Sequence, residues 1–167
     1  MYSIDSMSAA DAAAYEDILD ICFGPGRKAK ISYRFRDNVP ASSEFCMSAH
    51  ADGEGLIGAI QYWPCRVNNL RAELLGPIAV LPHWRGRGVA RALVHQSMAR
   101  VAEAGVDIVV LVGDPALYRQ YGFYPASAQS MVIANEDPTR VQIHPFTAAG
   151  EMAWGPVTPL VPASAVA

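Results

Sequence analysis

The stretch LPHWRGRGVARALV, residues 81–94, places two glycines and three arginines immediately before a run of apolar residues with helical spacing. A helix start leaves backbone N–H groups without partners and carries partial positive charge, which attracts phosphate oxygens. Gly86 and Gly88 would let the backbone approach such an anion closely. Positive charge around it would come from the arginines, Arg85, Arg87 and Arg91. The stretch therefore predicts either an anion-binding loop or an ordinary glycine-containing connection with a solvated basic rim.

Three familiar motifs do not fit this stretch. It lacks the Gly-Lys-Ser/Thr ending of a P-loop and the full GxGxxG spacing of a dinucleotide fingerprint. RNA-binding arginine–glycine repeats are disordered, whereas this single RGRG segment lies between a strand-like and a helix-like segment. The elements around the stretch must therefore decide between the two interpretations.

The N-terminal third predicts helices and a short strand. Residues 2–4 are typical of a strand, and Ser8 is the expected N-cap of a helix that ends at Gly24. Residues 27–40 are basic and only weakly periodic, so they predict either a short helix or a loop bordering a site.

The middle of the chain predicts extended structure. Residues 44–67 indicate an antiparallel hairpin, with an irregularity at Pro64 late in its second strand. Residues 70–82 predict a third strand, and we expect the Gly76-Pro77 pair to interrupt its regular pairing with a bulge.

The C-terminal half alternates between helical and extended patterns. A helix is expected over residues 90–105, a buried strand over 106–113 and a short helix from Asp114. Residues 130–146 predict two strands around an Asn-Glu-Asp-Pro turn, and the small, proline-spaced residues after them are expected to be loosely packed.

Length and composition are those of one globular unit. The chain has 167 residues, 51% of them apolar, and no repeat or linker divides it, so residues 1–167 are expected to form a single domain. A net charge of −3 argues against nucleic-acid and anionic-membrane partners. Three separated cysteines and an acidic N-terminus predict reduced thiols and a cytoplasmic location without a membrane span. A homodimer is one option for its assembly.

Two motifs carry a resemblance to a known family. The segment IAVLPHWRGRGVARALV resembles the acyl-CoA-binding segment of the GNAT superfamily of N-acetyltransferases, with its Arg-x-x-Gly-x-Ala pattern at Arg85, Gly88 and Ala90. The later segment ALYRQYGFYPA resembles the Tyr-x-x-x-Gly-Phe segment of that superfamily, with Tyr118, Gly122 and Phe123 at the matching positions. The resemblance covers at least residues 44–126. Within the superfamily, the chain resembles a bacterial subgroup of small predicted acetyltransferases.

The resemblance implies a fold, a cosubstrate and a set of binding residues. The fold would be mixed α/β, with a central, mostly antiparallel, twisted sheet flanked by helices and strands that splay at the cofactor site. Acetyl-CoA would be held by the backbone of a strand and by the loop and helix start after it, through Ile78, Ala79, Val80, Arg85, Gly86, Arg87, Gly88, Val89, Ala90 and Arg91. The first three would pair with the pantetheine arm like an added strand, and the backbone N–H groups of residues 86–91 would hold the pyrophosphate.

The implied reaction is acetyl transfer to an amine by direct attack, which needs a polarised carbonyl and a proton for the departing thiolate. Tyr118, a phenol with a reference pKa of about 10, suits the general acid and would face the thioester sulfur. A backbone N–H near Val80 would polarise the carbonyl. Glu73 is a candidate general base, although a cross-strand charge on the solvent face explains it as well.

Other features qualify this picture. Many family members carry an asparagine before the helix that bears the tyrosine, where this chain has Gly113-Asp114-Pro115. No metal is expected, because the histidines lack metal-ligand spacing. A non-catalytic acyl-CoA-binding or sensor domain is the alternative function, since it would keep the loop and lack productive acceptor chemistry.

The amine acceptor is not identified by the sequence. An apolar pocket could be lined by aromatic residues from two segments, Tyr33, Phe35, Tyr62 and Trp63. Arg34 or Arg36 could receive a carboxylate, but core packing and solvation explain all of these residues equally well.

Overall fold

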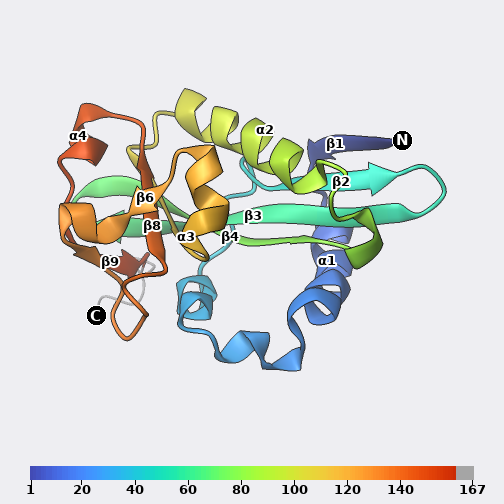
Figure 1. Cartoon of the computed structure of the whole chain (residues 1–167), viewed down its shortest axis with the longest axis horizontal. Coiled ribbons are helices and arrows are strands. Elements are labelled where there is room, and N and C mark those ends of the chain that lie inside the picture. The colour runs from blue at the N-terminus through green and yellow to red at the C-terminus, as the bar shows by residue number, and fades with distance from the viewer. Residues whose placement is uncertain (161–167) are drawn as a thin grey trace.

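The computed structural model describes residues 1–160 and is built on one large sheet (Figure 1). Neighbouring strands follow the order β1 (Tyr2–Ser6), β2 (Met47–Ala51), β3 (Gly55–Val67), β4 (Leu70–Val80), β5 (Ile108–Val112), β8 (Val141–Pro145) and β6 (Tyr124–Pro125). Along this path only β4 and β5 are parallel. The predicted mixed α/β fold with a mostly antiparallel sheet is therefore confirmed.

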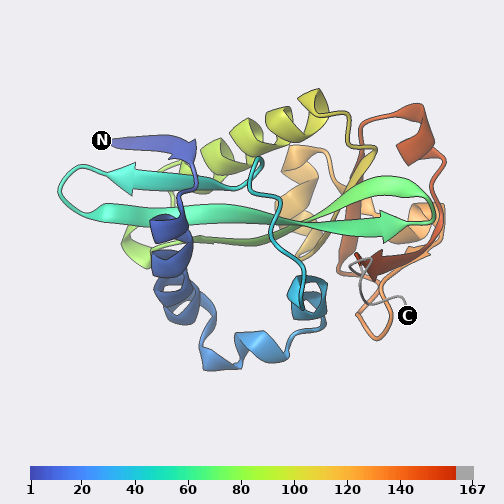
Figure 2. The same cartoon turned by 180° about the vertical axis from the view of Figure 1, so that it is seen from behind.

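Two long helices cover opposite sides of the sheet (Figures 1 and 2). Helix α2 (Val89–Glu103) buries the apolar side that its helical spacing predicts, over β2, β3 and β4. Helix α1 (Ala9–Phe23) packs Tyr15, Ile18 and Leu19 against small residues of β3 and β4. Neither is a membrane span, and no other helix within residues 1–160 is long and apolar enough to cross a bilayer.

Local capping fixes the start of α1. The Ser8 side chain accepts a hydrogen bond of 3.0 Å from the Asp11 backbone N–H, and the Asp11 carboxylate accepts one of 3.1 Å from the Ser8 N–H. This reciprocal pair is a capping box, which satisfies two N–H groups that the helix itself cannot. The predicted N-cap at Ser8 is confirmed.

Strand β4 changes partners half-way along its length. It pairs with β5 only from Ala72 to Leu74, and its remaining part lies against β3 alone. The β3–β4 register shifts between Ile60 and Tyr62, so that Gly76 and Pro77 both face a single position of β3. Gly76 has a φ of 135°, which side-chain-bearing residues rarely adopt. The predicted interruption is confirmed, and beyond it β4 and β5 diverge.

The irregularity expected at Pro64 is wrong. Pro64 sits in regular register opposite Glu73, within an uninterrupted β3. No strand pairs with the other edge of β3 at this position within the described residues, because β2 pairing ends at Ile60 and β9 (Gly155–Pro159) pairing begins at Cys65. A proline there costs no ladder bond on that edge.

The two strands predicted over residues 130–146 do not pair with each other. Strands β7 (Met131–Val132) and β8 both exist, but β7 runs parallel to β9 while β8 lies between β5 and β6. Residues 155–159, expected to be loosely packed, instead form β9, which pairs with the end of β3 and buries Val157. The last residues, 161–167, lie outside the described part of the chain.

Two short helical turns connect α1 to the rest of the sheet. Residues 25–36 form the 3-10 helices η1 (Pro25–Ala29) and η2 (Ile31–Arg36), a form intermediate between the predicted helix and loop. In Figure 1 they lie on the α1 side, below the sheet. Phe35 fixes this segment to the core, with 2% of its surface exposed.

Candidate functional site

The loop before α2 has the geometry of an anion site. Gly88 is the N-cap of α2 in the left-handed conformation, with a φ of 82° and no capping side chain. Gly86 has a φ of 75°, and a Cβ built on it would meet nothing within 4 Å. Within residues 1–160 no hydrogen-bond acceptor lies on the backbone N–H groups of residues 86–91. Of the two interpretations of this stretch, the geometry favours the anion-binding loop.

Positive side chains surround this loop. The three arginines, Arg85, Arg87 and Arg91, are all exposed. The Arg87 guanidinium carbon lies 4.8 Å above the centre of the Trp84 ring, and Trp84 itself donates a hydrogen bond of 3.1 Å to Glu54. The loop therefore offers free N–H donors beside solvent-accessible cations, as a pyrophosphate requires.

Within residues 1–160 no strand pairs with the second edge of β4 beyond Leu74, and the Cys22 thiol donates a hydrogen bond of 3.4 Å to the Val80 carbonyl. Ile78, Ala79 and Val80 pair with Ile60, Ala59 and Gly58 of β3, while β5 has already separated from β4. Backbone groups on the open side of residues 78–80 can therefore pair with an extended ligand as they would with another strand. These are the strand residues that the family resemblance singled out.

A cavity of about 570 Å³ opens where β4 and β5 diverge. We call it the Tyr118 cavity. It is enclosed by η1 and η2, the middle of β4, the end of β5, the second half of α3 (Pro115–Tyr118) and the loop after β7. Its wall includes Arg27, Lys30, Tyr33, Arg36, Trp63, Leu74, Leu75, Gly76, Pro77, Ile78, Gly113, Asp114, Leu117, Tyr118, Glu136 and Arg140.

Short-range interactions hold Tyr118 in this wall. The Asp114 carboxylate caps α3 by accepting a hydrogen bond of 2.9 Å from the Ala116 N–H, and Pro115 occupies the first helical position. The Tyr118 ring packs edge-on against Phe123, with ring centres 6.1 Å apart. Burial, followed by the neighbouring Tyr121, raises the pKa of Tyr118 to about 12. The phenol therefore keeps its proton at neutral pH, although it is a weaker acid than a free tyrosine.

The structure does not bring Glu73 into the Tyr118 cavity. Glu73 is 2% exposed and accepts a hydrogen bond of 2.7 Å from the Ser42 hydroxyl. It lines a separate cavity of about 540 Å³ together with Cys65 and Arg71. Burial raises its pKa to about 7, against the opposing effect of the Ser42 hydrogen bond. The alternative of a solvent-face charge is wrong because the side chain is buried.

The acceptor-side candidates separate into two groups. Tyr33, Trp63 and Arg36 line the Tyr118 cavity, whereas Arg34 is exposed outside it. The remaining two aromatic residues are core residues. Phe35 is buried, and the hydroxyl of the fully buried Tyr62 lies 2.8 Å from Ser97 Oγ.

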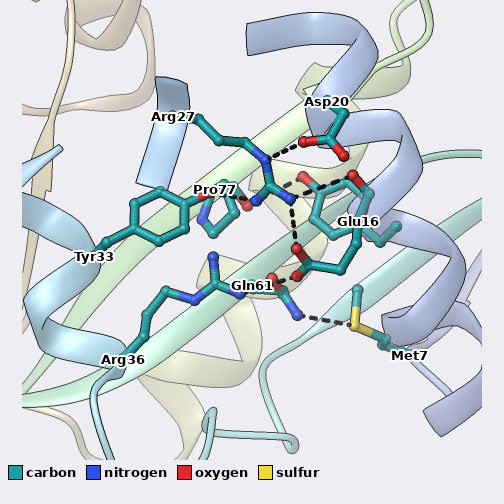
Figure 3. A network of polar contacts seen from close by, with 9 residues as sticks. Met7, Glu16, Asp20, Arg27, Tyr33, Arg36, Gln61 and Pro77 are labelled. Atoms are coloured by element: carbon teal, nitrogen blue, oxygen red, sulfur yellow. Dashed lines mark hydrogen bonds and ion pairs between the residues drawn. The ribbon is translucent and has the colours of Figure 1, made fainter. Parts of the chain in front are cut away.

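One polar cluster at the cavity was not singled out by the sequence (Figure 3). Arg27 is 2% exposed, yet it donates to Glu16 at 2.6 Å, to Asp20 at 2.8 Å and to the Tyr33 hydroxyl at 2.6 Å. Arg36 donates to the other oxygen of Glu16 at 3.1 Å. Only the spacing of Glu16 and Asp20, one turn apart on a helix, could have indicated a shared partner.

No metal-ligand cluster accompanies the site. Within residues 1–160 no group of three His, Cys, Asp or Glu side chains could hold a metal ion. His83 instead lies 2.7 Å from Glu54, and His50 lies 2.9 Å from Asp11.

Comparison with known proteins identifies relatives over most of the chain. Residues 3–126 match the model of a protein family described as an acetyltransferase (GNAT) domain. The chain is 32% identical over 116 residues to the Escherichia coli K12 protein described as "Uncharacterized N-acetyltransferase YhbS", covering 68% of each.

Solved structures share the fold. The structure of Escherichia coli YhbS in complex with CoA superposes with a TM-score of 0.80 and 26% identity, over 93% of this chain and 88% of that chain. A GNAT family acetyltransferase from Brucella melitensis in complex with acetyl-CoA gives a TM-score of 0.71 and 22% identity, over 96% and 97% of the two chains. The second similarity concerns the fold alone.

Proposed function

Because this chain belongs to the GNAT acetyltransferase family, we propose that it transfers the acetyl group of acetyl-CoA to a primary amine by direct attack. One observation carries the proposal. The free edge of β4 begins in the wall of the Tyr118 cavity at Ile78 and leads to the loop whose backbone N–H groups have no acceptor within the described residues. A ligand with an extended arm and a pyrophosphate fits this continuous path.

The binding half of the proposal uses backbone groups and charge. The N–H groups of residues 86–91 would receive the pyrophosphate oxygens, with the arginines around them adding favourable potential. The open side of residues 78–80 would pair with the amides of the pantetheine arm. CoA and acetyl-CoA are bound in the structures of the two solved relatives, which supports this assignment.

The acetyl transfer itself would take place in the Tyr118 cavity. Acetyl-CoA supplies an acetyl thioester; a bond forms between the amine nitrogen and the acetyl carbon, and the carbon–sulfur bond breaks. The protonated Tyr118 would give its proton to the departing sulfur, and the polar backbone near Val80 would stabilise negative charge on the carbonyl oxygen. Holding both reactants in one cavity contributes much of the acceleration, and no covalent enzyme intermediate is needed.

The proton lost by the amine would pass to water rather than to Glu73, and the Tyr118 phenolate would recover a proton from water after CoA leaves. A pKa of about 7 suits a general base. Glu73 nevertheless lines its own cavity beside Ser42 and does not line the Tyr118 cavity. Its role as base stays a prediction.

Calorimetric titration with acetyl-CoA tests the binding half. Gly86→Glu places a carboxylate where the phosphate would sit, and we expect it to abolish binding by blockage and repulsion. Gly105→Glu is the matched control, because Gly105 has the same φ of 75° and nothing within 4 Å of a built Cβ, but lies beyond the other end of α2. Equal binding by both variants would contradict the pyrophosphate site. Tight binding without acetylation of any amine would favour the sensor function instead.

A further inference from the structure

We propose that the acceptor is a small amine carrying a carboxylate, and that Arg36, together with the indole N–H of Trp63, receives that carboxylate in the Tyr118 cavity. This inference rests on the proposed function and names the substrate class of the same site. It starts from two buried hydrogen-bond donors, on residues that line the cavity, for which residues 1–160 provide no acceptor.

Arg36 is held rigidly by its neighbours (Figure 3). Its guanidinium carbon lies 4.6 Å from the centre of the Tyr33 ring and 4.7 Å from that of the Trp63 ring. Its Nη2 donates to Glu16 at 3.1 Å. Two aromatic contacts and an ion pair therefore fix the plane of the guanidinium before any ligand arrives, which lowers the entropy cost of binding.

The other half of Arg36 has no partner. Within residues 1–160, Arg36 Nη1 and Trp63 Nε1 are both buried without a hydrogen-bond acceptor. Trp63 is 8% exposed, and both residues line the Tyr118 cavity. Guanidinium and indole groups can only donate, so the missing partner is an acceptor. Leaving such donors unpaired is costly, and a carboxylate offers two oxygens that satisfy them together.

Arg36 is a better anion receptor than the other cations of this wall. Arg27 already uses its donors on two carboxylates, Glu16 and Asp20, and on the Tyr33 hydroxyl. The Lys30 ammonium lies 4.7 Å above the Phe23 ring, on a flexible stem. Arg140 also lines the cavity but is exposed to solvent, whereas Arg36 Nη1 is a buried cationic donor without an acceptor in residues 1–160, on a guanidinium stacked against Trp63, whose Nε1 is a second such donor.

The size of the cavity indicates a small acceptor. A volume of about 570 Å³ lies in the range of pockets that enclose small molecules. The rest of the wall near β4 is apolar, with Leu74, Leu75 and Pro77. An amino acid with an apolar side chain matches this combination of a carboxylate receptor and an apolar surface.

The test uses matched acceptors that differ only in the carboxylate. Leucine, leucinamide and 3-methylbutan-1-amine form one set, and phenylalanine, phenylalaninamide and 2-phenylethylamine form another. Acetylation by the purified full chain is followed by CoA release. We expect the free acid to exceed its amide and its descarboxy amine by about 10-fold or more in kcat/KM, because a charge-assisted pair is lost in both.

Variants then assign the preference to Arg36. Arg36→Gln should lower kcat/KM for the free acids by about 10-fold or more, mainly through KM, and leave the descarboxy amines unchanged. Trp63→Phe keeps a ring and removes the indole N–H, and a smaller loss is expected. Arg34→Gln, an exposed arginine of the same short helix, is the control expected to behave like the parent. Retained acetyl-CoA binding shows that each variant is folded.

Each result decides a different claim. Transfer to amines with no preference for the carboxylate, or an equal loss for acids and descarboxy amines in Arg36→Gln, overturns this inference and leaves the proposed function standing. Acetyl-CoA binding without transfer to any member of either set overturns this inference alone, whereas absence of acetyl-CoA binding overturns both.

Discussion

Gly113 lies directly against the ring of Tyr118. A Cβ built on Gly113 would lie inside contact distance of Tyr118 Cε2 and 3.0 Å from Cδ2. The absence of a side chain at the end of β5 therefore allows the tyrosine to fold back over the strand end and into the cavity wall. This pair also gives a physical role to the connection that replaces the family's usual asparagine.

Gly113→Ala should displace the Tyr118 ring. A shift of about 1 Å in a reacting group is enough to cost about 100-fold in rate, so we expect kcat to fall by about 10- to 100-fold while acetyl-CoA still binds. Gly26→Ala is the control, because a Cβ there meets nothing within 4 Å and its φ is not left-handed. An unchanged kcat in Gly113→Ala would show that the ring position does not matter for transfer.

Tyr118→Phe should remove the proton donor without removing the ring. General acid catalysis contributes about 100- to 10,000-fold, so kcat should fall within that range with little change in the KM for acetyl-CoA. Tyr121→Phe, on a neighbouring ring 6.4 Å away, is the matched control and should retain activity. Full turnover by Tyr118→Phe would remove Tyr118 from the mechanism.

The pKa of Tyr118 predicts the alkaline limit of its role. Because burial raises this pKa to about 12, the phenol stays protonated and no activity is lost through its ionisation below about pH 11. The pH profiles of kcat for the parent and Tyr118→Phe, measured from pH 7 to 10, should therefore run parallel. A fall in the kcat of the parent with a midpoint near pH 9, absent from Tyr118→Phe, would contradict the burial of the phenol.

Glu73 should make the protein less stable as the pH rises from about 4.5 to about 7. Burial raises its pKa from 4.5 to about 7, so the folded protein holds this proton more tightly than the unfolded chain. The stabilisation is fully present below the unfolded pKa and is lost as the pH passes through the folded pKa. A shift of this size corresponds to about 3 kcal/mol.

Urea unfolding of Glu73→Gln across this pH window measures the effect. The variant should gain stability relative to the parent as the pH rises from about 4.5 to about 7, because it cannot ionise. A constant difference between Glu73→Gln and the parent would indicate an ordinary carboxyl pKa.

Arg27 should stabilise the short helices that close the Tyr118 cavity. Arg27→Met removes the shared partner of Glu16 and Asp20, and a loss of about 1–3 kcal/mol in the free energy of unfolding is expected because both carboxylates are partly solvated. Urea unfolding measures it, with the exposed neighbour Lys28→Met as control. Equal stability of the two variants would show that the network contributes nothing.

Features governed by a few neighbouring residues were predictable. Ser8 caps its helix, Gly86 and Gly88 adopt left-handed backbone at the start of α2, and Gly76-Pro77 interrupts β4. Capping, allowed φ values and helical spacing depend on residues within one or two turns of chain, and the sequence displays those directly. The same local patterns carried the family resemblance that the comparisons confirmed.

Features that depend on contacts between distant segments could not be predicted from the sequence. Pro64 is tolerated because no strand of residues 1–160 pairs with one edge of β3 there, and residues 155–159 are ordered by pairing with that same strand. Glu73 could be placed on its strand from the sequence, but its burial beside Ser42 and its separation from the Tyr118 cavity depend on what covers that face.

The sequence by itself determined the family, the glycine-rich start of α2 and the position of Tyr118 along the chain. Only the tertiary structure decided that Arg36 and Trp63 line the same cavity as Tyr118, while Arg34 and Phe35 do not. The physical reason is that backbone conformation and capping are local, whereas a cavity is formed by side chains that a one-dimensional pattern cannot bring together.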